Sequence, residues 1–321
     1  ECMSLIGGNL PGTLVGAAPG ADFMLYRAEE TGQERYVEED WVAAAIERAV
    51  DSGAQVISIS LGYRYDYTDG SPDLAYREFD GRTRPSSLAA LGAARRNVLV
   101  SVSMGNEGGL AGPANPATLS APADADSILG VGMVDRSRKR CGYSSTGPSA
   151  DGRIKPDLVS MGINNCTVAV AATDTPSPDI DELAGTSFAA PAMAGVAALL
   201  RQLAPDKSAE EIRQAMLRTA DNHGSPENLV GYGLVDAAAA AQALGAPVSP
   251  PLAEQGLSRL YVRGGIDPII LDWEPGAAKP SLQLSDLSGR RIPIAVTAVG
   301  SQLYVQPDRA LRTGIYIARV R

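Results

Sequence analysis

The sequence predicts an α/β fold in which a mostly parallel sheet carries helices on both faces, followed by a small all-β domain. Along residues 1–244, short apolar segments bounded by turn residues alternate with helical patterns, and this alternation is typical of βαβ units. Hydrophobic residues make up 45% of the 321-residue chain and charged residues 20%. The chain is therefore globular and long enough to bury a large core.

The first part of the chain alternates between predicted strands and helices. Strands are predicted at 22–27, 55–62 and 98–105, where apolar or alternating runs end at turn residues. Helices are predicted at 40–53 and 86–97, the first because its apolar residues recur at helical spacing. Parallel strands need such helical crossovers, so a covered parallel sheet follows.

The next part adds a further strand and more helices. Residues 127–134 form an apolar run that predicts a strand. The run of small apolar residues within 183–200 predicts a helix that is apolar on every face and is therefore buried. Residues 208–220 predict an amphipathic helix, which begins with a capping box formed by Ser208 and Glu211.

The composition changes after Ala246. Residues 245–256 are rich in Pro and Gly and predict a linker. Residues 257–321 consist of short alternating runs, some separated by turn-forming clusters, and predict a small antiparallel β-sandwich. The expected organisation is a first domain over 1–244, the linker, and this β domain.

Charge and cysteine usage exclude several classes of function. The net charge of −9 argues against a nucleic-acid partner, and the basic cluster 136–140 is read as a solvated turn. The three cysteines lack C-x-x-C spacing and His223 is the single histidine, so no zinc or thiol-redox motif is present. One cysteine pair could form a disulfide, and the sequence does not say which. No signal peptide and no apolar run of about 18 residues is found, so no membrane span is predicted.

Candidate binding residues follow predicted strands at their carboxyl ends, where open α/β sheets bind ligands. Asn106 stands between glycines after the strand at 98–105, and Ser60-Leu61-Gly62 closes the strand at 55–62. Backbone at 60–62 could pair with an extended peptide. The alternatives are an ordinary turn asparagine and an ordinary strand end.

Thr186 and Ser187 stand directly before the apolar helix. A serine or threonine there is typical of a helix cap. Acyl transfer, however, needs a nucleophile, a base, and donors aimed at the developing oxyanion. Ser187 would supply the nucleophile and one N–H donor, and the amide of Asn106 a second donor, whereas the residues supply no base.

Several segments resemble, in the expected order, motifs of the subtilisin-like serine proteases, the subtilase family. GTSFAAPAMAGVAALL resembles the nucleophile motif, SMGNEG the oxyanion segment and VISISLG the substrate-binding strand. Residues 144–162 resemble the G-P-x-x-D-G-R-x-K-P-D segment, although Ser160-Met161-Gly162 stands where Ala-Pro-Gly is more usual. GTLVGAAPGADFMLYR and GYGLVDAAAA also match. The resemblance covers about residues 1–244.

The resemblance implies a serine endopeptidase acting on protein or peptide substrates. Ser187 would be the nucleophile and Asn106 the oxyanion donor, with Thr186 supporting the same region. One side of the bound peptide would be lined by Ser60, Leu61 and Gly62, and the other side, with the wall of the specificity pocket, by Ser103, Met104 and Gly105. The chemistry needs no cofactor. Calcium is common in the family, but no acidic spacing here identifies a metal site.

The family's catalytic Asp and His are missing from this chain. ECMSLIGGN resembles the helix that follows the family's H-G-T motif, so the expectation is a chain cut off before both residues and inactive by itself. His223 lies in a polar loop and is not expected to replace the base. The alternatives are a non-catalytic surface binding or structural module that keeps the protease fold, and a serine hydrolase of esters or small amides. No G-x-S-x-G elbow supports the last.

The tail resembles the C-terminal sorting domains of the bacterial type IX secretion route, through LSDLSGRRI and LRTGIYIARVR. A generic β-sandwich accessory or carbohydrate-binding module is the alternative. Either implies a secreted or cell-surface bacterial protein, and the first adds the secretion machinery as a partner.

Overall fold

The computed structural model describes most of the first 246 residues and strands of the C-terminal part. The described ranges are 1–10, 14–112, 115–163, 165–170, 176–246, 257–262, 269–272, 282–286, 291–299, 302–307 and 314–320. The chain forms two units, one made of Glu1–Asn9 and Gly16–Pro247, the other of Leu10–Val15 and Val248–Arg321.

The larger unit is built on a parallel sheet with the strand order β3-β4-β5-β6. Its strands are β3 (Val56–Ile59), β4 (Leu99–Ser103), β5 (Leu129–Val134) and β6 (Leu158–Met161). Every residue of β4 and β5 is buried, as expected for parallel strands with both faces covered. The strands predicted at 55–62, 98–105 and 127–134 are confirmed, and β6 is an addition.

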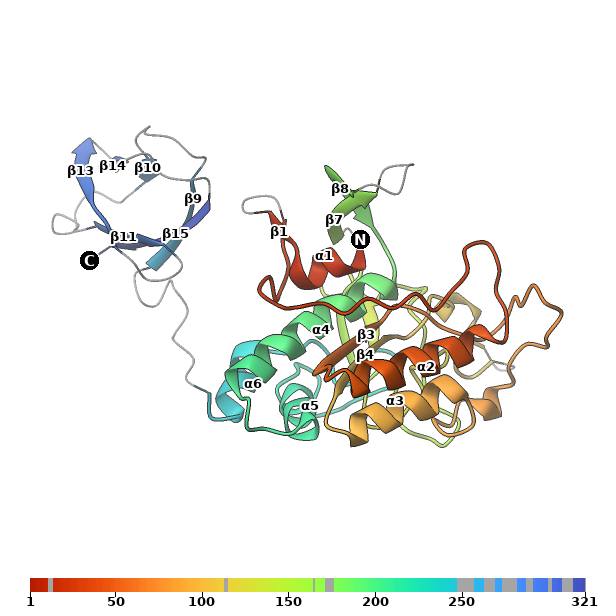
Figure 1. Ribbon diagram of the computed structural model, residues 1–321. Coiled ribbons are helices and arrows are strands. Elements are labelled where there is room, and N and C mark those ends of the chain that lie inside the picture. Colours follow the sequence, from red (N-terminus) through yellow and green to blue (C-terminus); the bar gives the residue numbers. More distant parts are fainter. Residues whose placement is uncertain are drawn as a thin grey trace. The chain divides into compact units, whose positions relative to one another are not determined.

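Helices cover both faces of this sheet (Figure 1). α2 packs against α3 on one face, and α4 crosses all four strands on the other. The helices are α1 (Cys2–Gly7), α2 (Glu38–Asp51), α3 (Pro85–Arg95), α4 (Thr186–Leu203), α5 (Ala209–Arg218) and α6 (Ala237–Ala243). The helices predicted at 40–53, 86–97, 183–200 and 208–220 are confirmed. The capping box is confirmed too, since Glu211 N–H donates to Ser208 Oγ and Ser208 N–H to the Glu211 carboxylate.

Small residues allow α4 to lie close to its neighbours. A Cβ on Gly195 would come within 2.7 Å of Ala17 Cβ, so a larger residue would push α4 away from the segment beside it. On the sheet side, Ser101 Oγ of β4 donates a 2.8 Å hydrogen bond to the carbonyl of Ala190. The hydrogen bond ties the N-terminal half of α4 to β4, and Gly195 lets the middle of the helix lie close to the segment around Ala17.

The prediction of a strand at 22–27 is wrong. The segment runs through extended backbone, but it belongs to no strand, and no backbone N–H of residues 22–28 donates to another backbone carbonyl in the described structure. Leu25 is 75% exposed and Met24 46%. A strand is defined by its ladder with a neighbour, and the described chain places none beside this segment.

Short elements complete the larger unit. The hairpin of β7 (Asn165–Val170) and β8 (Pro176–Leu183) leads into α4, and two 3₁₀ turns, η1 (Tyr76–Glu78) and η2 (Gly108–Leu110), lie in loops. The basic cluster 136–140 follows β5 as a turn, with 136–139 exposed, as predicted.

In the second unit, the described strands β9–β15 form antiparallel pairs. One sheet has the order β12-β11-β15-β9 and another β10-β14-β13. The strands are β1 (Asn9–Leu10), which pairs with β2 (Leu14–Val15), and β9 (Leu257–Val262), β10 (Ile269–Asp272), β11 (Leu282–Asp286), β12 (Arg291–Ile292), β13 (Ile294–Val299), β14 (Gln302–Pro307) and β15 (Gly314–Val320). Most of the predicted linker 245–256 and parts of both tail motifs lie outside the described residues. The β-sandwich therefore stays a prediction.

Candidate active site

The carboxyl edge of the sheet brings together the residues selected from the sequence. Ser60, Leu61 and Gly62 follow β3, and Gly105 and Asn106 follow β4. The first turn of α4, with Thr186 and Ser187, faces both strand ends: Ser187 contacts Ser60, and Thr186 contacts Gly105 and Asn106. Parallel strands end at the same edge, which is why segments distant in sequence meet here.

Ser187 is a residue of the helix and does not cap it. The N-cap is Gly185, which has φ +153°, and no side chain caps the helix. Ser187 is half-buried, and its Oγ lies 3.4 Å from the carbonyl oxygen of Ser60. A backbone carbonyl accepts a hydrogen bond but is too weak a base to activate a hydroxyl. The reading of Ser187 as a plain cap is wrong.

Pro191 explains a second link between Ser187 and the sheet. Proline has no N–H, so the carbonyl of Ser187, four residues earlier, lacks its usual helical donor. That carbonyl accepts instead from Ser60 Oγ at 2.7 Å and from Cys2 Sγ at 3.3 Å. The proline thus ties the start of α4 to β3 and to α1.

Thr186 sets the orientation of the Asn106 side chain. The backbone N–H of Thr186 donates to Asn106 Oδ1 at 3.0 Å, and Thr186 Oγ1 lies 3.2 Å from the same oxygen. A backbone N–H can only donate, so the atom facing it must be the amide oxygen. Asn106 is exposed, and its Nδ2 donors are directed away from this contact. Thr186 is completely buried and also bonds the N–H of Gly105 at 3.2 Å.

Gly62 and Gly105 keep the space between the strand ends narrow and free of side chains. A Cβ on Gly62 would lie 3.0 Å from Ser120 Cβ. Gly105 has φ +102°, and a Cβ there would lie 2.4 Å from Glu107 Oε2 and 2.9 Å from both Ser120 Oγ and Ser145 Oγ. Only glycine fits both the conformation and the space at residue 105.

The remaining sequence-selected residues form the wall behind this space. Ser103 Oγ donates to the carbonyl of Leu61 at 3.3 Å, which joins the two strand ends. Met104 is fully buried, so its side chain belongs to the core, while its carbonyl accepts from Ser120 N–H at 3.2 Å.

Sequence reasoning missed Cys2, Glu107, Ser120 and Ser145. Ser145 Oγ donates to Glu107 Oε2 at 2.9 Å and accepts from Glu107 N–H at 3.0 Å, which fixes the carboxylate behind Gly105. Glu107 directly follows Asn106, so its position in the sequence could have indicated that it lies at the site. The other three come from distant segments, and nothing in the sequence indicated that they lie there.

A base for Ser187 is absent from the described residues. Among those residues, the hydrogen-bond partner of Ser187 Oγ is the Ser60 carbonyl and not a histidine, lysine or carboxylate, and no group of three His, Cys, Asp or Glu side chains is placed to hold a metal ion. His223 is exposed, as predicted, in the turn after α5, where its Nδ1 lies 2.9 Å from the Ala220 carbonyl oxygen. Within the same part of the chain, no helix is long and apolar enough to cross a membrane.

Comparisons with known proteins identify one family. Residues 2–233 match the family model described as the Subtilase family. Subtilisin BL of Lederbergia lenta is 30% identical over 227 residues, which cover 71% of this chain and 70% of that protein. Subtilisin DY of Bacillus licheniformis is 32% identical over 201 residues, 63% of this chain and 62% of that protein.

Solved structures share the fold. The structure of the MycP3 protease from the type VII (ESX-3) secretion system has a TM-score of 0.58 and 27% identity, and the match covers 75% of this chain and 71% of that one. The self-cleaved protease domain of PatA has a TM-score of 0.57 and 24% identity, over 77% of this chain and 83% of that one.

Proposed function

The chain belongs to the subtilase family of serine endopeptidases, and from this premise we propose that it hydrolyses peptide bonds through an acyl-enzyme on Ser187. One observation carries the proposal: Thr186 N–H holds Asn106 Oδ1 at 3.0 Å and so leaves the Nδ2 donors of Asn106 for a ligand beside Ser187. A nucleophile next to a preorganised donor is the arrangement that acyl transfer needs.

The oxyanion would be held by two donors. The N–H of Ser187 lies in the first turn of α4, where backbone N–H groups have no helical acceptor and the helix dipole favours negative charge. The second donor would be Asn106 Nδ2. In subtilisin itself, loss of the corresponding side-chain donor lowers kcat by about 10²–10³, and we expect Asn106→Ala to fall in this range.

The substrate would lie extended between the two strand ends. It would be lined by Ser60, Leu61 and Gly62 on one side and by Ser103, Met104 and Gly105 on the other. The hydrogen bond from Ser103 Oγ to the carbonyl of Leu61 joins the two sides and supports this placement.

We place the catalytic Asp and His N-terminal to Glu1 in the complete protein, so residues 1–321 alone would be inactive. The path of α1 supports this: Cys2 Sγ lies 3.3 Å from the Ser187 carbonyl oxygen, and residues leading into Glu1 would therefore pass close to the nucleophile. Ser187 would give its proton to this histidine, which would return it to the leaving amine.

The decisive experiment is fluorophosphonate labelling of the native protein from its source, with mass spectrometry to locate the adduct. An adduct on Ser187, absent from the Ser187→Ala variant, is expected because only an activated serine reacts. A folded native protein that takes no label would favour the non-catalytic binding module. Comparing a peptide with a simple ester would then separate an endopeptidase from an esterase.

The remaining expectations concern the whole protein. We propose that it acts outside the cell or at its surface and that residues 257–321 are read by secretion machinery. Deleting 257–321 should then abolish release into the medium without removing the fluorophosphonate reaction from the cell lysate. The proposed chemistry uses no cofactor. Calcium binding stays an expectation from the family resemblance, and no residues are assigned to it.

A further inference from the structure

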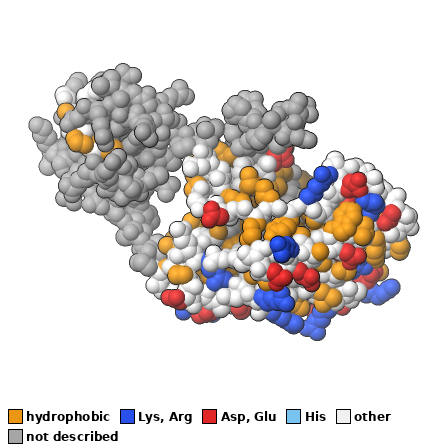
Figure 2. Space-filling model, in the orientation of Figure 1, with side chains coloured by type: hydrophobic (Ala, Val, Ile, Leu, Met, Phe, Trp, Pro, Cys, Tyr) orange, Lys and Arg blue, Asp and Glu red, His pale blue; other side chains and the backbone are white. Residues whose placement is uncertain are grey.

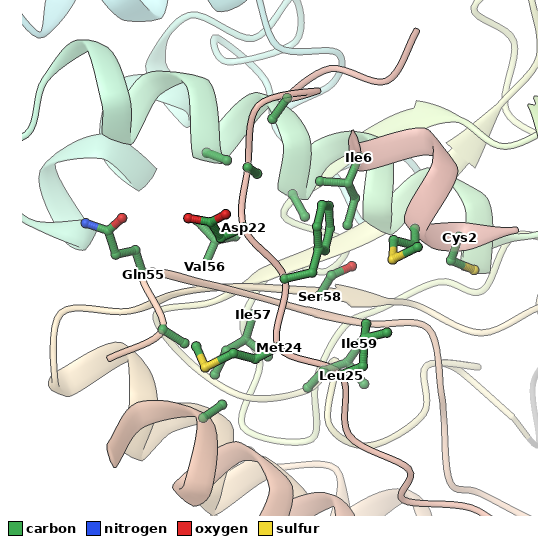
Figure 3. A pocket seen from close by; sticks show the side chains of 18 of the residues that line it. Cys2, Ile6, Asp22, Met24, Leu25, Gln55, Val56, Ile57, Ser58 and Ile59 are labelled. Carbon is green, nitrogen blue, oxygen red and sulfur yellow. The ribbon is translucent and has the colours of Figure 1, made fainter. Parts of the chain in front are cut away.

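On its β3 side, the candidate active site is bordered by apolar surface. A groove of about 1290 Å³ runs along β3. Figure 3 shows Met24 and Leu25 of the extended segment together with Val56, Ile57 and Ile59 of β3 around this groove. Hydrophobic side chains gather on this face of the unit (Figure 2). Apolar walls of this kind give no favourable contact to an anionic ligand.

Carboxylates gather just beyond the end of β3. Tyr63 directly follows Gly62, and its hydroxyl donates to Glu29 Oε1 at 3.1 Å. Burial raises the pKa of Tyr63, and the carboxylates of Glu29, Glu34 and Glu38 raise it further, so all three act on the same place. Because like charges repel, acidic residues of a substrate are disfavoured on this side of the site.

The other side of the site carries the opposite charge. β5 lies beyond β4 from β3 in the sheet, and residues 136–140, the basic turn, follow β5 at the carboxyl edge. Arg136, Arg138 and Lys139 are exposed, and Arg140 is half-buried. In a chain of net charge −9, four cations among five residues create a local positive potential that attracts anionic groups.

The backbone of the basic turn is fixed by its own hydrogen bonds. Asp135 Oδ1 accepts from the N–H groups of Ser137 at 2.8 Å and Lys139 at 3.0 Å, and the Asp135 N–H donates to the Lys139 carbonyl at 2.9 Å. The ion pairs among the described residues include neither Arg138 nor Lys139. These two exposed cations are therefore available to a ligand on a preorganised turn.

The basic turn lies against the loop that carries Asn106. Arg140 Nη2 donates to the carbonyl of Ser144, and a Cβ on Gly108 would lie 2.6 Å from the same nitrogen. The N–H of Gly108 donates to the Tyr143 carbonyl at 2.9 Å. Gly108 stands two residues after Asn106, so these contacts hold the turn beside the oxyanion donor.

We propose that the basic turn binds acidic side chains of the substrate on the leaving-amine side of the scissile bond. The inference rests on the proposed function, in which the substrate lies between the ends of β3 and β4 with its scissile carbonyl at Asn106. The acyl half occupies that space, and the leaving half continues past Asn106 toward β5. Neighbouring strands lie about 4.8 Å apart and an extended peptide advances about 3.3 Å per residue, so residues about two to five positions after the scissile bond reach the turn.

Steady-state kinetics of the full-length enzyme on two matched peptides test the proposal. Both are quenched-fluorescence peptides cleaved at one bond, and the second to fourth residues after that bond are Glu in one and Gln in the other. We expect kcat/KM to be about tenfold higher for the Glu peptide at low ionic strength, because each exposed ion pair adds only a small factor. The preference should shrink to about twofold in about 0.5 M salt, where exposed charges are screened. Equal kcat/KM values at low ionic strength would overturn the proposal.

A matched pair of variants assigns the preference to the turn. Arg138→Asn with Lys139→Gln removes two exposed cations, and asparagine tolerates the φ of +62° at residue 138. Arg95→Asn with Arg96→Gln removes the same charge from the exposed end of α3, at the opposite edge of the sheet. The preference for the Glu peptide should fall to about twofold in the first variant and stay about tenfold in the second. An equal loss in both would assign it to net charge and overturn the proposal.

Binding to the full-length Ser187→Ala protein separates this inference from catalysis. Fluorescence anisotropy should show tighter binding of the Glu peptide than of the Gln peptide. That result beside a wild-type Ser187 that takes no fluorophosphonate label would support the acidic-peptide surface and refute the peptidase alone. A labelled Ser187 with equal binding of both peptides refutes the surface alone. Binding of dextran sulfate without a preference between the peptides would assign the turn to an anionic polysaccharide and overturn the proposal.

Discussion

At the scale of single residues, Thr186 contributes more to the site than its place beside Ser187 suggests. It is fully buried, its N–H and Oγ1 both contact Asn106 Oδ1, and Oγ1 also bonds the N–H of Gly105. In the proposed function it is therefore a positioning residue, because it would act on the substrate only through Asn106.

Replacing Thr186 with Val should lower kcat about tenfold in the full-length enzyme and leave KM unchanged. The change removes Oγ1 and leaves Asn106 held only by the backbone N–H, so the oxyanion donor is less well aligned in the transition state. Thr186→Ser keeps the hydroxyl and should retain most of the activity. Steady-state kinetics on a peptide substrate measure kcat and KM of both variants. An equal loss of kcat in Thr186→Val and Thr186→Ser would assign Thr186 a purely packing role.

Gly105 is required by its conformation and by its neighbours. At φ +102° an added Cβ would lie 2.4 Å from Glu107 Oε2, so Gly105→Ala should lower the free energy of unfolding by about 1–3 kcal/mol. Gly142→Ala, which meets nothing within 4 Å, should change it by less than about 0.5 kcal/mol. Urea unfolding measures both, and equal stability of the two variants would contradict the strain at residue 105.

Glu34 makes stability depend on pH. Burial raises its pKa to about 7 from the ordinary 4.5, and the carboxylates of Glu29, Glu38 and Asp66 add to the rise. Since the folded state holds this proton more tightly than the unfolded state, its contribution to stability falls as the pH rises from 4.5 to about 7.

Glu34→Gln removes this dependence. Relative to wild type, the variant should gain in Tm as the pH rises through that interval, as measured by thermal melts in buffers of equal ionic strength. Glu47→Gln, an exposed change on α2, is the control. A constant difference between wild type and Glu34→Gln at all pH values would refute the assignment.

At the scale of elements, a buried charge cluster joins the residues just before β6 to α5 and to the loop before β5. Lys155 Nζ donates to Asp157 Oδ2 at 2.6 Å and to the Ala125 carbonyl at 2.8 Å, and Arg213 Nη2 of α5 bonds Asp157 Oδ1 at 3.1 Å. Burial opposes the charge on Asp157, but Lys155 and Arg213 outweigh it and hold the pKa below 3.8.

Asp157→Asn should therefore lower the free energy of unfolding by about 3–5 kcal/mol, because it leaves two buried cations without their carboxylate. The ion pair between half-buried Arg153 and exposed Asp151 provides the comparison: Asp151→Asn should lose at most about 1 kcal/mol. Denaturant unfolding at neutral pH measures the two. Similar losses would mean that the buried cluster adds nothing beyond a surface ion pair.

The same cluster predicts the response to acid. A carboxylate with a lowered pKa stabilises the folded state above its unfolded pKa of about 3.8, and the contribution is lost as the pH falls through the lower folded value. Wild type should lose stability relative to Asp157→Asn below about pH 4. A difference that stays constant down to about pH 2 would be inconsistent with a lowered pKa.

At the scale of the whole molecule, the parallel sheet and its two helical layers followed from the sequence. Apolar runs at 98–105 and 127–134 are strands buried along their whole length, and helical spacing at 40–53 gave α2. The segment 22–27 has the same local pattern and forms no strand. Local pattern reports the preference of a segment, whereas a strand also needs a neighbour to complete its ladder.

The sequence by itself determined the strands β3, β4 and β5 with the helices between them, the family, and the identity of Ser187, Thr186 and Asn106 as candidates. These depend on local spacing and on motifs, which can be recognised in the amino-acid sequence. Only the tertiary structure decided that Thr186 holds Asn106 by its oxygen, that Pro191 frees the Ser187 carbonyl for Ser60, and that β3 borders an open apolar groove. Ser60 and Ser187 are 127 positions apart. Contacts of this kind depend on how the sheet and helices pack in space, and no local pattern encodes them.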